Sequence, residues 1–114
     1  MPDDNTTLTT AALHILVAIG PGERHGYAIM TEVEQLTHGM VRLAPGTLYT
    51  TIKRLLAAGL IEEGGERPDP HLDDQRRRYY RLTPGGRATV ASEVRRLQAI
   101  VSSARPWAID GGGH

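Results

Sequence analysis

The chain of 114 residues contains no cysteine. It can therefore form neither a disulfide framework nor a metal site built on thiolates. It also lacks any run of about 18 consecutive apolar residues, the length that a membrane-spanning helix needs. The acidic start, Met1-Pro2-Asp3-Asp4, lacks the apolar segment of a secretory signal peptide. We therefore expect one cytoplasmic domain with a modest core and no membrane partner.

Catalytic and metal-binding motifs are missing as well. The sequence contains no GxSxG or HExxH pattern and no phosphate-binding glycine loop, and without cysteine no Cys–His pair exists. The histidines His14, His25, His38 and His71 do not fall at the spacing of metal ligands. We expect a protein that is not an enzyme and that has no catalytic residues, no metal and no cofactor.

A net charge is also absent, yet the charges are segregated along the chain. Residues 1–41 and 59–75 are acidic. Residues 42–58 carry three cations and no acid, and residues 76–96 carry seven arginines and one glutamate. Because the neutralisation of phosphates depends on local charge, the overall balance does not exclude binding to nucleic acid.

The segment from Ala44 to Ile61 has the pattern of a short helix with two faces. Its apolar residues recur at helical spacing and form one stripe: Leu48, Ile52, Leu55 and Leu56. Pro45 suits the first turn of such a helix, because its missing N–H costs nothing there. Gly59 suits the left-handed residue that follows the last turn.

The opposite face of this predicted helix contains no acid. It offers hydroxyl groups and cations, which come from Thr47, Tyr49, Thr50, Thr51, Lys53 and Arg54. A helix that is buried on one side and presents hydroxyls and positive charge on the other suits the major groove of DNA. The alternative is a solvated charged face, which is the usual state of exposed helical cations.

Two further helices are expected before this segment. The first is apolar around most of its circumference; it is capped by Thr6, Thr7 or Thr9 and ends at Gly20-Pro21-Gly22. The second runs from about His25 to Thr37. Its predicted inner stripe consists of Tyr27, Met30, Val33 and Leu36.

Two strands are expected after the helix of the Ala44–Ile61 segment. They are Leu60–Glu63 and Arg76–Leu82, and a polar loop at 64–75 joins them. The alternation of the second strand places Arg78, Tyr80 and Leu82 on one face. Two strands joined in this way directly after a helix pair form a hairpin wing. The arginine run 76–78 is either a solvated strand end or a contact with a phosphate backbone.

The last predicted helix begins at Thr83, which suits an N-cap, and ends at Pro106. Its apolar residues alternate four and three apart and form a narrow heptad seam: Val90, Val94, Leu97 and Val101. This seam either packs on its own domain or meets a partner helix. Because the first three helices bury one another and leave little core for it, the narrow seam favours a partner helix. We expect a homodimer, with Trp107 packed at its interface.

Three motifs, in this order, resemble the PadR family of bacterial transcriptional regulators. They are His25-Gly26-Tyr27, Pro45-Gly46-Thr47-Leu48-Tyr49, and Arg78-Tyr79-Tyr80-Arg81-Leu82-Thr83 followed by Gly86. The resemblance runs from about Leu8 to Arg105 and looks like the short subfamily. It implies a mainly α fold with a small two-stranded β-wing, a winged helix-turn-helix domain followed by a long C-terminal dimerisation helix.

The expected organisation is a flexible tail at 1–7, a DNA-binding domain at 8–82, a dimerisation helix at 83–105 and a flexible tail at 106–114. The resemblance implies that the third helix enters the major groove, that Tyr27 and Tyr49 support or contact phosphates, and that the first helix assists dimerisation. It also implies that, in some members, a small molecule bound near the dimer interface releases the DNA.

We therefore expect a cytoplasmic, nucleoid-associated homodimer that represses transcription from a pseudo-palindromic operator in double-stranded DNA until a small-molecule effector of unknown identity releases it. The expected DNA contacts are Tyr27, Gly46, Thr47, Tyr49, Thr50, Lys53, Arg54, Arg76, Arg77 and Arg78. The expected dimer contacts are Leu8, Ile15, Val90, Val94, Leu97, Val101 and Trp107. The acidic segments and the overall neutrality support an alternative, a winged-helix module that binds protein and not DNA.

Overall fold

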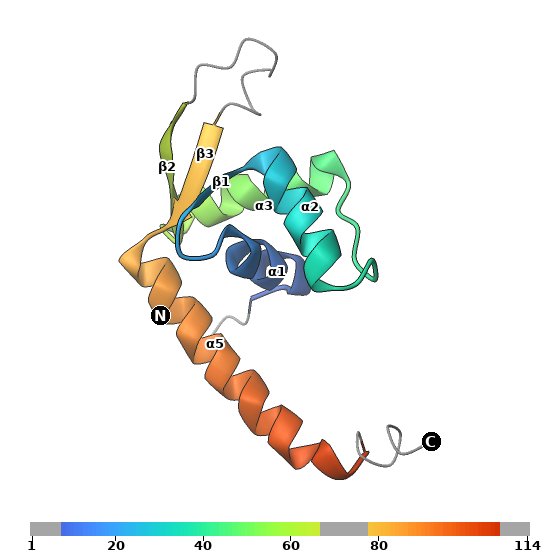
Figure 1. Cartoon of the computed structure of the whole chain (residues 1–114). Coiled ribbons are helices and arrows are strands. Elements are labelled where there is room, and N and C mark those ends of the chain that lie inside the picture. The colour runs from blue at the N-terminus through green and yellow to red at the C-terminus, as the bar shows by residue number, and fades with distance from the viewer. Residues whose placement is uncertain (1–7, 67–77, 108–114) are drawn as a thin grey trace.

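The computed structural model describes residues 8–66 and 78–107 (Figure 1). Its elements follow one another as α1 (Thr10–Ile19), β1 (Glu23–His25), α2 (Gly26–Leu36), α3 (Pro45–Ala57), β2 (Ile61–Glu66), β3 (Arg78–Leu82) and α5 (Pro84–Ser103). The predicted succession of three helices, a wing and a long last helix is confirmed. None of the helices in the described ranges is long and apolar enough to cross a membrane.

Local side-chain chemistry sets the ends of these helices. In three places a side chain accepts a hydrogen bond from a backbone N–H three residues on: Thr9 from Ala12, His25 from Ala28 and Thr83 from Gly86. Such caps satisfy N–H groups that have no partner inside the helix. Of the three threonines predicted to cap the first helix, Thr9 does so, and the other two lie outside the described residues.

Helix α3 ends as its sequence predicts. Gly59 adopts a φ of 77°, the left-handed conformation that glycine enters without a steric penalty. Its N–H donates to the carbonyl of Leu56 at 3.1 Å, and the N–H of Leu60 donates to the carbonyl of Leu55 at 3.0 Å. These two bonds form a Schellman motif, which closes the helix and turns the chain into β2.

The sheet has three strands rather than the two expected from the sequence. The strand order is β1-β3-β2, and both pairs are antiparallel, with Glu23 and Ile61 opposite Arg81 and Leu82. Strand β1 escaped prediction because it is only three residues long, Glu-Arg-His, and shows no alternation of apolar and polar residues. It pairs because the turn after α1 places it beside the edge of β3 that β2 does not occupy.

Ion pairs on one face of the sheet tie the three strands together. The Arg81 guanidinium in β3 bonds the carboxylate of Glu62 in β2 at 2.8 Å and that of Glu23 in β1 at 3.1 Å. The register of β2 shifts between Glu63 and Gly65. At Gly64 a Cβ atom would overlap the Glu23 carboxylate, so a larger residue at this position would require the end of that side chain to move.

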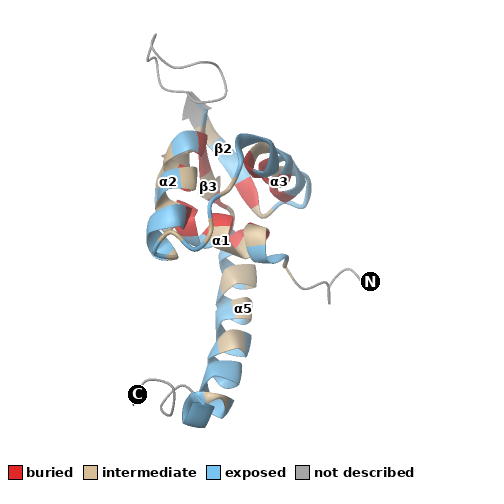
Figure 2. Ribbon diagram, turned by 90° about the vertical axis from the view of Figure 1, so that its right-hand side faces the viewer, coloured by how far each residue is buried: buried red, intermediate tan, exposed pale blue. Residues whose placement is uncertain are grey.

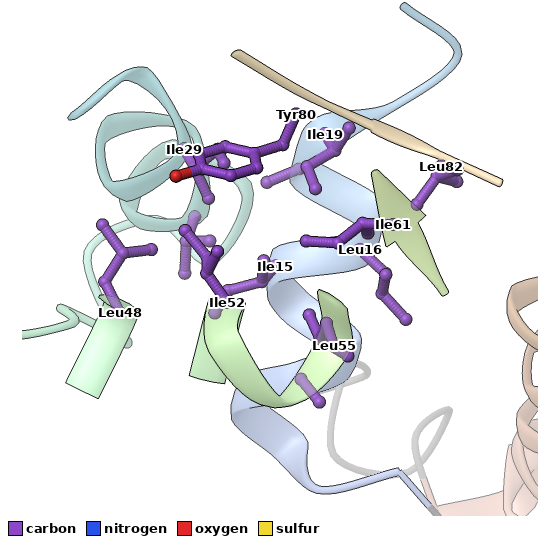
Figure 3. Packing of buried hydrophobic residues seen from close by; sticks show 13 residues of the cluster. Ile15, Leu16, Ile19, Ile29, Leu48, Ile52, Leu55, Ile61, Tyr80 and Leu82 are labelled. Atoms are coloured by element: carbon purple, nitrogen blue, oxygen red, sulfur yellow. The ribbon is translucent and has the colours of Figure 1, made fainter. Parts of the chain in front are cut away.

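The hydrophobic core lies where α1, α2, α3 and the sheet meet (Figure 3). Its largest fully buried side chains are Ile15, Leu16, Ile19, Ile29, Leu48, Ile52 and Val33. Strand β3 contributes Tyr80 and Leu82, as its alternation predicts. The expectation that Ile15 contacts a dimer partner is wrong, because this side chain has no exposed surface in the single chain.

The inner face of α2 also differs from the predicted stripe. Ile29 and Val33 are fully buried, whereas Tyr27 is 52% exposed and Leu36 is 43% exposed. The sequence contains two overlapping apolar stripes at helical spacing, and the pattern alone does not rank them. The exposure of Tyr27 places its ring on the outer surface, beside α3.

Helix α5 extends away from the domain like an arm (Figures 1 and 2). Gly86, in its first turn, is its one buried residue, and Val90 packs against the core from the second turn. Further along, Val94 is 37% exposed and Val101 is 67% exposed. The helix ends at Ser103, with Ala104 as its C-cap, slightly before the predicted end at Pro106.

Candidate nucleic-acid interface

Helix α3 presents one polar face to solvent. Its buried residues are Leu48, Thr51, Ile52 and Leu55. Its exposed residues include Gly46, Thr47, Thr50, Lys53 and Arg54, all of which belong to the predicted DNA contacts. Within the described part of the chain, neither Lys53 nor Arg54 forms an ion pair, so both cations remain available to an external anion.

Tyr49 connects this helix to α2. A Cβ atom added at Gly26 would lie 2.5 Å from the hydroxyl oxygen of Tyr49 and 2.8 Å from its Cε1 atom. The ring therefore lies directly on the first turn of α2, in a space that only glycine leaves open. This contact joins two of the sequence motifs, since Gly26 belongs to the first and Tyr49 to the second.

A hollow of about 640 Å³ lies between α2, α3 and the sheet. Tyr27 and Met30 from α2 form one wall, and Tyr80, Glu63 and Arg78 from the strands form the other. The residues of α3 that border it are Pro45, Gly46, Tyr49, Thr50, Ile52, Lys53 and Leu56. The hollow thus collects three tyrosines and two cations beside the polar face of α3.

A second hollow, of about 520 Å³, borders α3 on its other flank. Its lining residues are Ala44, Gly46, Thr47, Thr50, Thr51 and Arg54. With a concave surface on either side, α3 forms a ridge from Gly46 to Arg54. A convex ridge with hydroxyls and cations fits a concave groove whose edges carry phosphates.

The charges around the first hollow are partly balanced. Arg78 lies 3.8 Å from the carboxylate of Glu63, and both side chains are about half exposed. Burial raises the pKa of Tyr80 above its usual value, and the charge of Glu63 adds to the effect. Tyr80 therefore remains a neutral phenol at physiological pH, while the positive charge of Arg78 is partly offset.

His25 is the N-cap of α2, the helix that forms one wall of the hollow. Its ring lies edge-on to Tyr79, with a centroid separation of 5.3 Å and an interplanar angle of 88°. Burial, assisted by the neighbouring Arg24, lowers the pKa of His25 below its usual 6.5. The neutral ring is the form that can accept the hydrogen bond from Ala28, because a protonated imidazole has no acceptor.

The structure places the predicted site residues unequally. Eight of the ten predicted DNA contacts lie on α3 or border its first hollow. The other two, Arg76 and Arg77, lie outside the described residues. Met30, Glu63 and Tyr80 also border the hollow but were missed as site residues. Tyr80 could have been found from the alternation of its strand, whereas the place of Glu63 depends on a register that the sequence does not display.

Apart from the buried Ile15, the predicted dimer contacts lie just before α1, along α5 and beyond its end. Leu8 and Val90 are partly buried against the core, while Val94, Val101 and Trp107 are exposed. A shallow hollow of about 500 Å³ follows the seam of α5 and is lined by Val94, Leu97, Gln98, Val101 and Ser102. The apolar seam is therefore open along the arm. In the described ranges, no three histidine or acidic side chains gather to hold a metal ion.

Known proteins resemble this chain in sequence. Residues 15–92 match the sequence profile of the transcriptional regulator PadR-like family. The transcriptional regulator Rv3488 of Mycobacterium tuberculosis is 39% identical over 88 residues, which cover 77% of this chain and 76% of that protein. The match to the family profile includes all of α2, α3, the strands and the first turns of α5.

Solved structures share the fold. A PadR family transcription regulator from Clostridium difficile aligns with a TM-score of 0.68 over 87% of this chain and 98% of that chain, at 21% identity. Bacillus subtilis PadR, determined in complex with operator DNA, aligns with a TM-score of 0.63 over 78% of this chain and 48% of that chain, at 19% identity. The fold is that of the PadR winged-helix regulators.

The contact between Gly26 and Tyr49 yields a first prediction. Gly26→Ala should displace the Tyr49 ring, because a Cβ atom cannot occupy the same space. We expect the affinity for duplex DNA to fall roughly tenfold, the effect of losing one hydrogen bond to a phosphate. Fluorescence anisotropy measures the affinity. Gly22→Ala is the control, since nothing lies within 4 Å of its Cβ position; equal affinities of the two variants would contradict the prediction.

The cap at His25 yields a second prediction. Because folding lowers the pKa of His25, the stability from this residue is present above the unfolded pKa of 6.5 and is lost as the pH falls through the folded pKa. In His25→Asn the amide caps without titrating. Urea unfolding from pH 8 to pH 5 should show a steeper loss of stability in the wild type. Parallel curves for the two proteins would show that His25 does not titrate on unfolding.

Proposed function

This chain belongs to the PadR-like family of transcriptional regulators, and we propose that it acts as a homodimeric repressor that binds a pseudo-palindromic operator. The family consists of DNA-binding regulators and not of enzymes. The proposal also covers which residues contact the DNA, how the dimer forms and how the operator is released.

One observation carries the DNA-binding proposal, the acid-free ridge of α3. Burial of its apolar face leaves Thr47, Thr50, Lys53 and Arg54 exposed side by side. Hydroxyls donate to or accept from base edges, and cations pair with phosphates or with guanine. Tyr27 and Tyr49, at the rim of the first hollow, lie where a phosphate backbone passes when the ridge enters a major groove.

Strand β3 supports a second contact through the wing. Arg78 is exposed and borders the same hollow as Lys53. A cation at this place reaches the backbone next to the groove that α3 occupies. Bacillus subtilis PadR, which shares this fold, was determined in complex with operator DNA, and this supports the proposal of DNA binding.

The dimer proposal follows from the open seam of α5. Val94, Leu97 and Val101 repeat four and three apart on an arm that the domain leaves uncovered. A seam of this spacing is satisfied by a second helix with the same pattern, and two-fold symmetry supplies it. Trp107 lies beyond the end of the seam and is 78% exposed, so it is available to the same interface.

The dimer would present two α3 ridges related by a two-fold axis. Such an arrangement reads half-sites about one helical turn apart, roughly 34 Å. Repression then needs only that the bound dimer covers promoter DNA. A small molecule that enters the hollow along the seam would change the pairing of the arms and thereby release the operator.

Removal of the two α3 cations tests the ridge. Lys53→Ala with Arg54→Ala should weaken binding to the selected operator and flatten the dependence of log affinity on log salt by up to about two, because each phosphate contact contributes about 0.9. The control, Arg95→Ala with Arg96→Ala, removes the same charge from α5. Unchanged affinity and slope in the α3 variant would show that another face reads the DNA.

A charge in the seam tests the dimer. Leu97→Asp should give monomers, because pairing would bury an uncompensated carboxylate. Operator affinity should fall roughly a hundredfold, which corresponds to about 2.7 kcal/mol. The control is Ala99→Asp, which places the same charge on the opposite face of α5. Sedimentation velocity measures the mass, and an intact dimer of the Leu97 variant would move the interface elsewhere.

A further inference from the structure

The end of α3 and the start of α5 are joined through a small set of backbone contacts. The Thr83 hydroxyl donates to the carbonyl of Gly59 at 2.6 Å, and the Thr83 N–H donates to the carbonyl of Leu60 at 3.0 Å. The same hydroxyl oxygen accepts from the N–H of Gly86 at 3.0 Å. One threonine thus binds the residues that close α3 and caps the helix that forms the arm.

Gly86 brings the two segments into direct backbone contact. A Cβ atom at this position would overlap the carbonyl oxygen of Leu60. The neighbouring Gly85 differs, because its Cβ position has only ordinary contacts at 3.7 Å. The first turn of α5 therefore lies on the chain that leaves α3, with no side chain between them.

In the described part of the chain, the other contacts of the arm are chiefly with α1 and the turn that follows it. Arg87 donates to the carbonyl of Pro21 at 3.2 Å, and Val90 packs against the core. Beyond Val90 no residue of α5 is buried. The contacts of Thr83 and Gly86 are therefore the ones that link the arm directly to the chain that leaves α3.

A small change in the angle between α3 and the arm would displace α3 by a large distance at the DNA. An α-helix of 20 residues is about 30 Å long, so a tilt of about 10° at one end moves the other by about 5 Å. Two-fold symmetry applies the tilt in both protomers. Successive base pairs are only about 3.4 Å apart, so a loose joint would shift the two ridges by a whole base pair or more.

We infer that Thr83 and Gly86 are positioning residues that set the half-site separation the dimer accepts. The inference rests on the proposed dimer and on α3 as the reading helix. The two residues act through α3 and need not touch the DNA.

A spacing series tests the inference. Duplexes carry two copies of the selected half-site, with their separation varied one base pair at a time, and anisotropy gives the affinity for each. The wild type should show one sharp optimum. Thr83→Val keeps the shape of the side chain but removes its hydroxyl, and should flatten the profile so that neighbouring separations bind within a fewfold of the best. Thr83→Ser should restore the sharp optimum.

A matched variant separates positioning from stability. Thr9→Val removes a threonine cap at α1 that makes the same bond to a backbone N–H but lies outside this joint. It should cost stability and leave the spacing optimum sharp. Gly86→Ala and Gly85→Ala form a second pair, in which only the first should disturb the joint. If Gly86→Ala fails to fold, the comparison of Thr83→Val with Thr9→Val still tests the inference.

A distance measurement gives a readout without DNA. Because the chain lacks cysteine, Ala57→Cys adds a single label site at the exposed end of α3. Pulsed electron resonance on the dimer should give a narrow distance distribution in the wild type and in Thr9→Val, and a broad one in Thr83→Val. Equal distance widths, or equal spacing profiles, in the wild type and Thr83→Val would overturn the inference but leave the proposed function in place. A wild type without a dimer or without a spacing optimum would overturn the proposed function, and the inference with it.

Discussion

The burial of Leu48, Ile52 and Leu55 fixes the rotation of α3 about its own axis, and the functional assignments depend on that rotation. These side chains are at most 4% exposed. Burying each of them contributes roughly 1.5–3 kcal/mol to the stability of the fold. Since a helix turns by about 100° per residue, a rotation by one position would expose part of the stripe and bury cations. The packing that stabilises the domain therefore also directs Lys53 and Arg54 towards solvent.

The placement of acids explains how a chain without net charge presents a cationic surface. In the sheet the arginines are paired, Arg81 with Glu62 and Glu23, and Arg78 with Glu63. Exposed pairs of this kind contribute little to stability, but they lower the local positive potential. The α3 cations have no such partner among the described residues. The ridge therefore keeps the full positive charge of Lys53 and Arg54, whereas the charge of the strand arginines is partly offset.

Much of this organisation could be predicted from the sequence, because it is encoded locally. The caps at Thr9 and Thr83, the left-handed Gly59 and the two faces of α3 each depend on residues within one or two turns. The failures depend on distant contacts. Strand β1 forms only because β3 offers an edge, and Ile15 is buried because α1 is covered by elements that follow it in the chain. Glu63 enters the hollow through a shift of register that no periodicity reveals.

Two glycines show how these distant contacts still leave a trace in the sequence. Glycine in a helix costs roughly 1 kcal/mol relative to alanine. Neither Gly26 nor Gly86 adopts a positive φ that would require it. Both instead permit a close approach, of the Tyr49 ring at Gly26 and of the Leu60 carbonyl at Gly86. Each glycine sits in a helix that contacts an end of α3, Gly26 near its beginning and Gly86 just after its end. The position of the ridge within the domain thus depends on two missing side chains at its two ends, as well as on the apolar stripe beneath it.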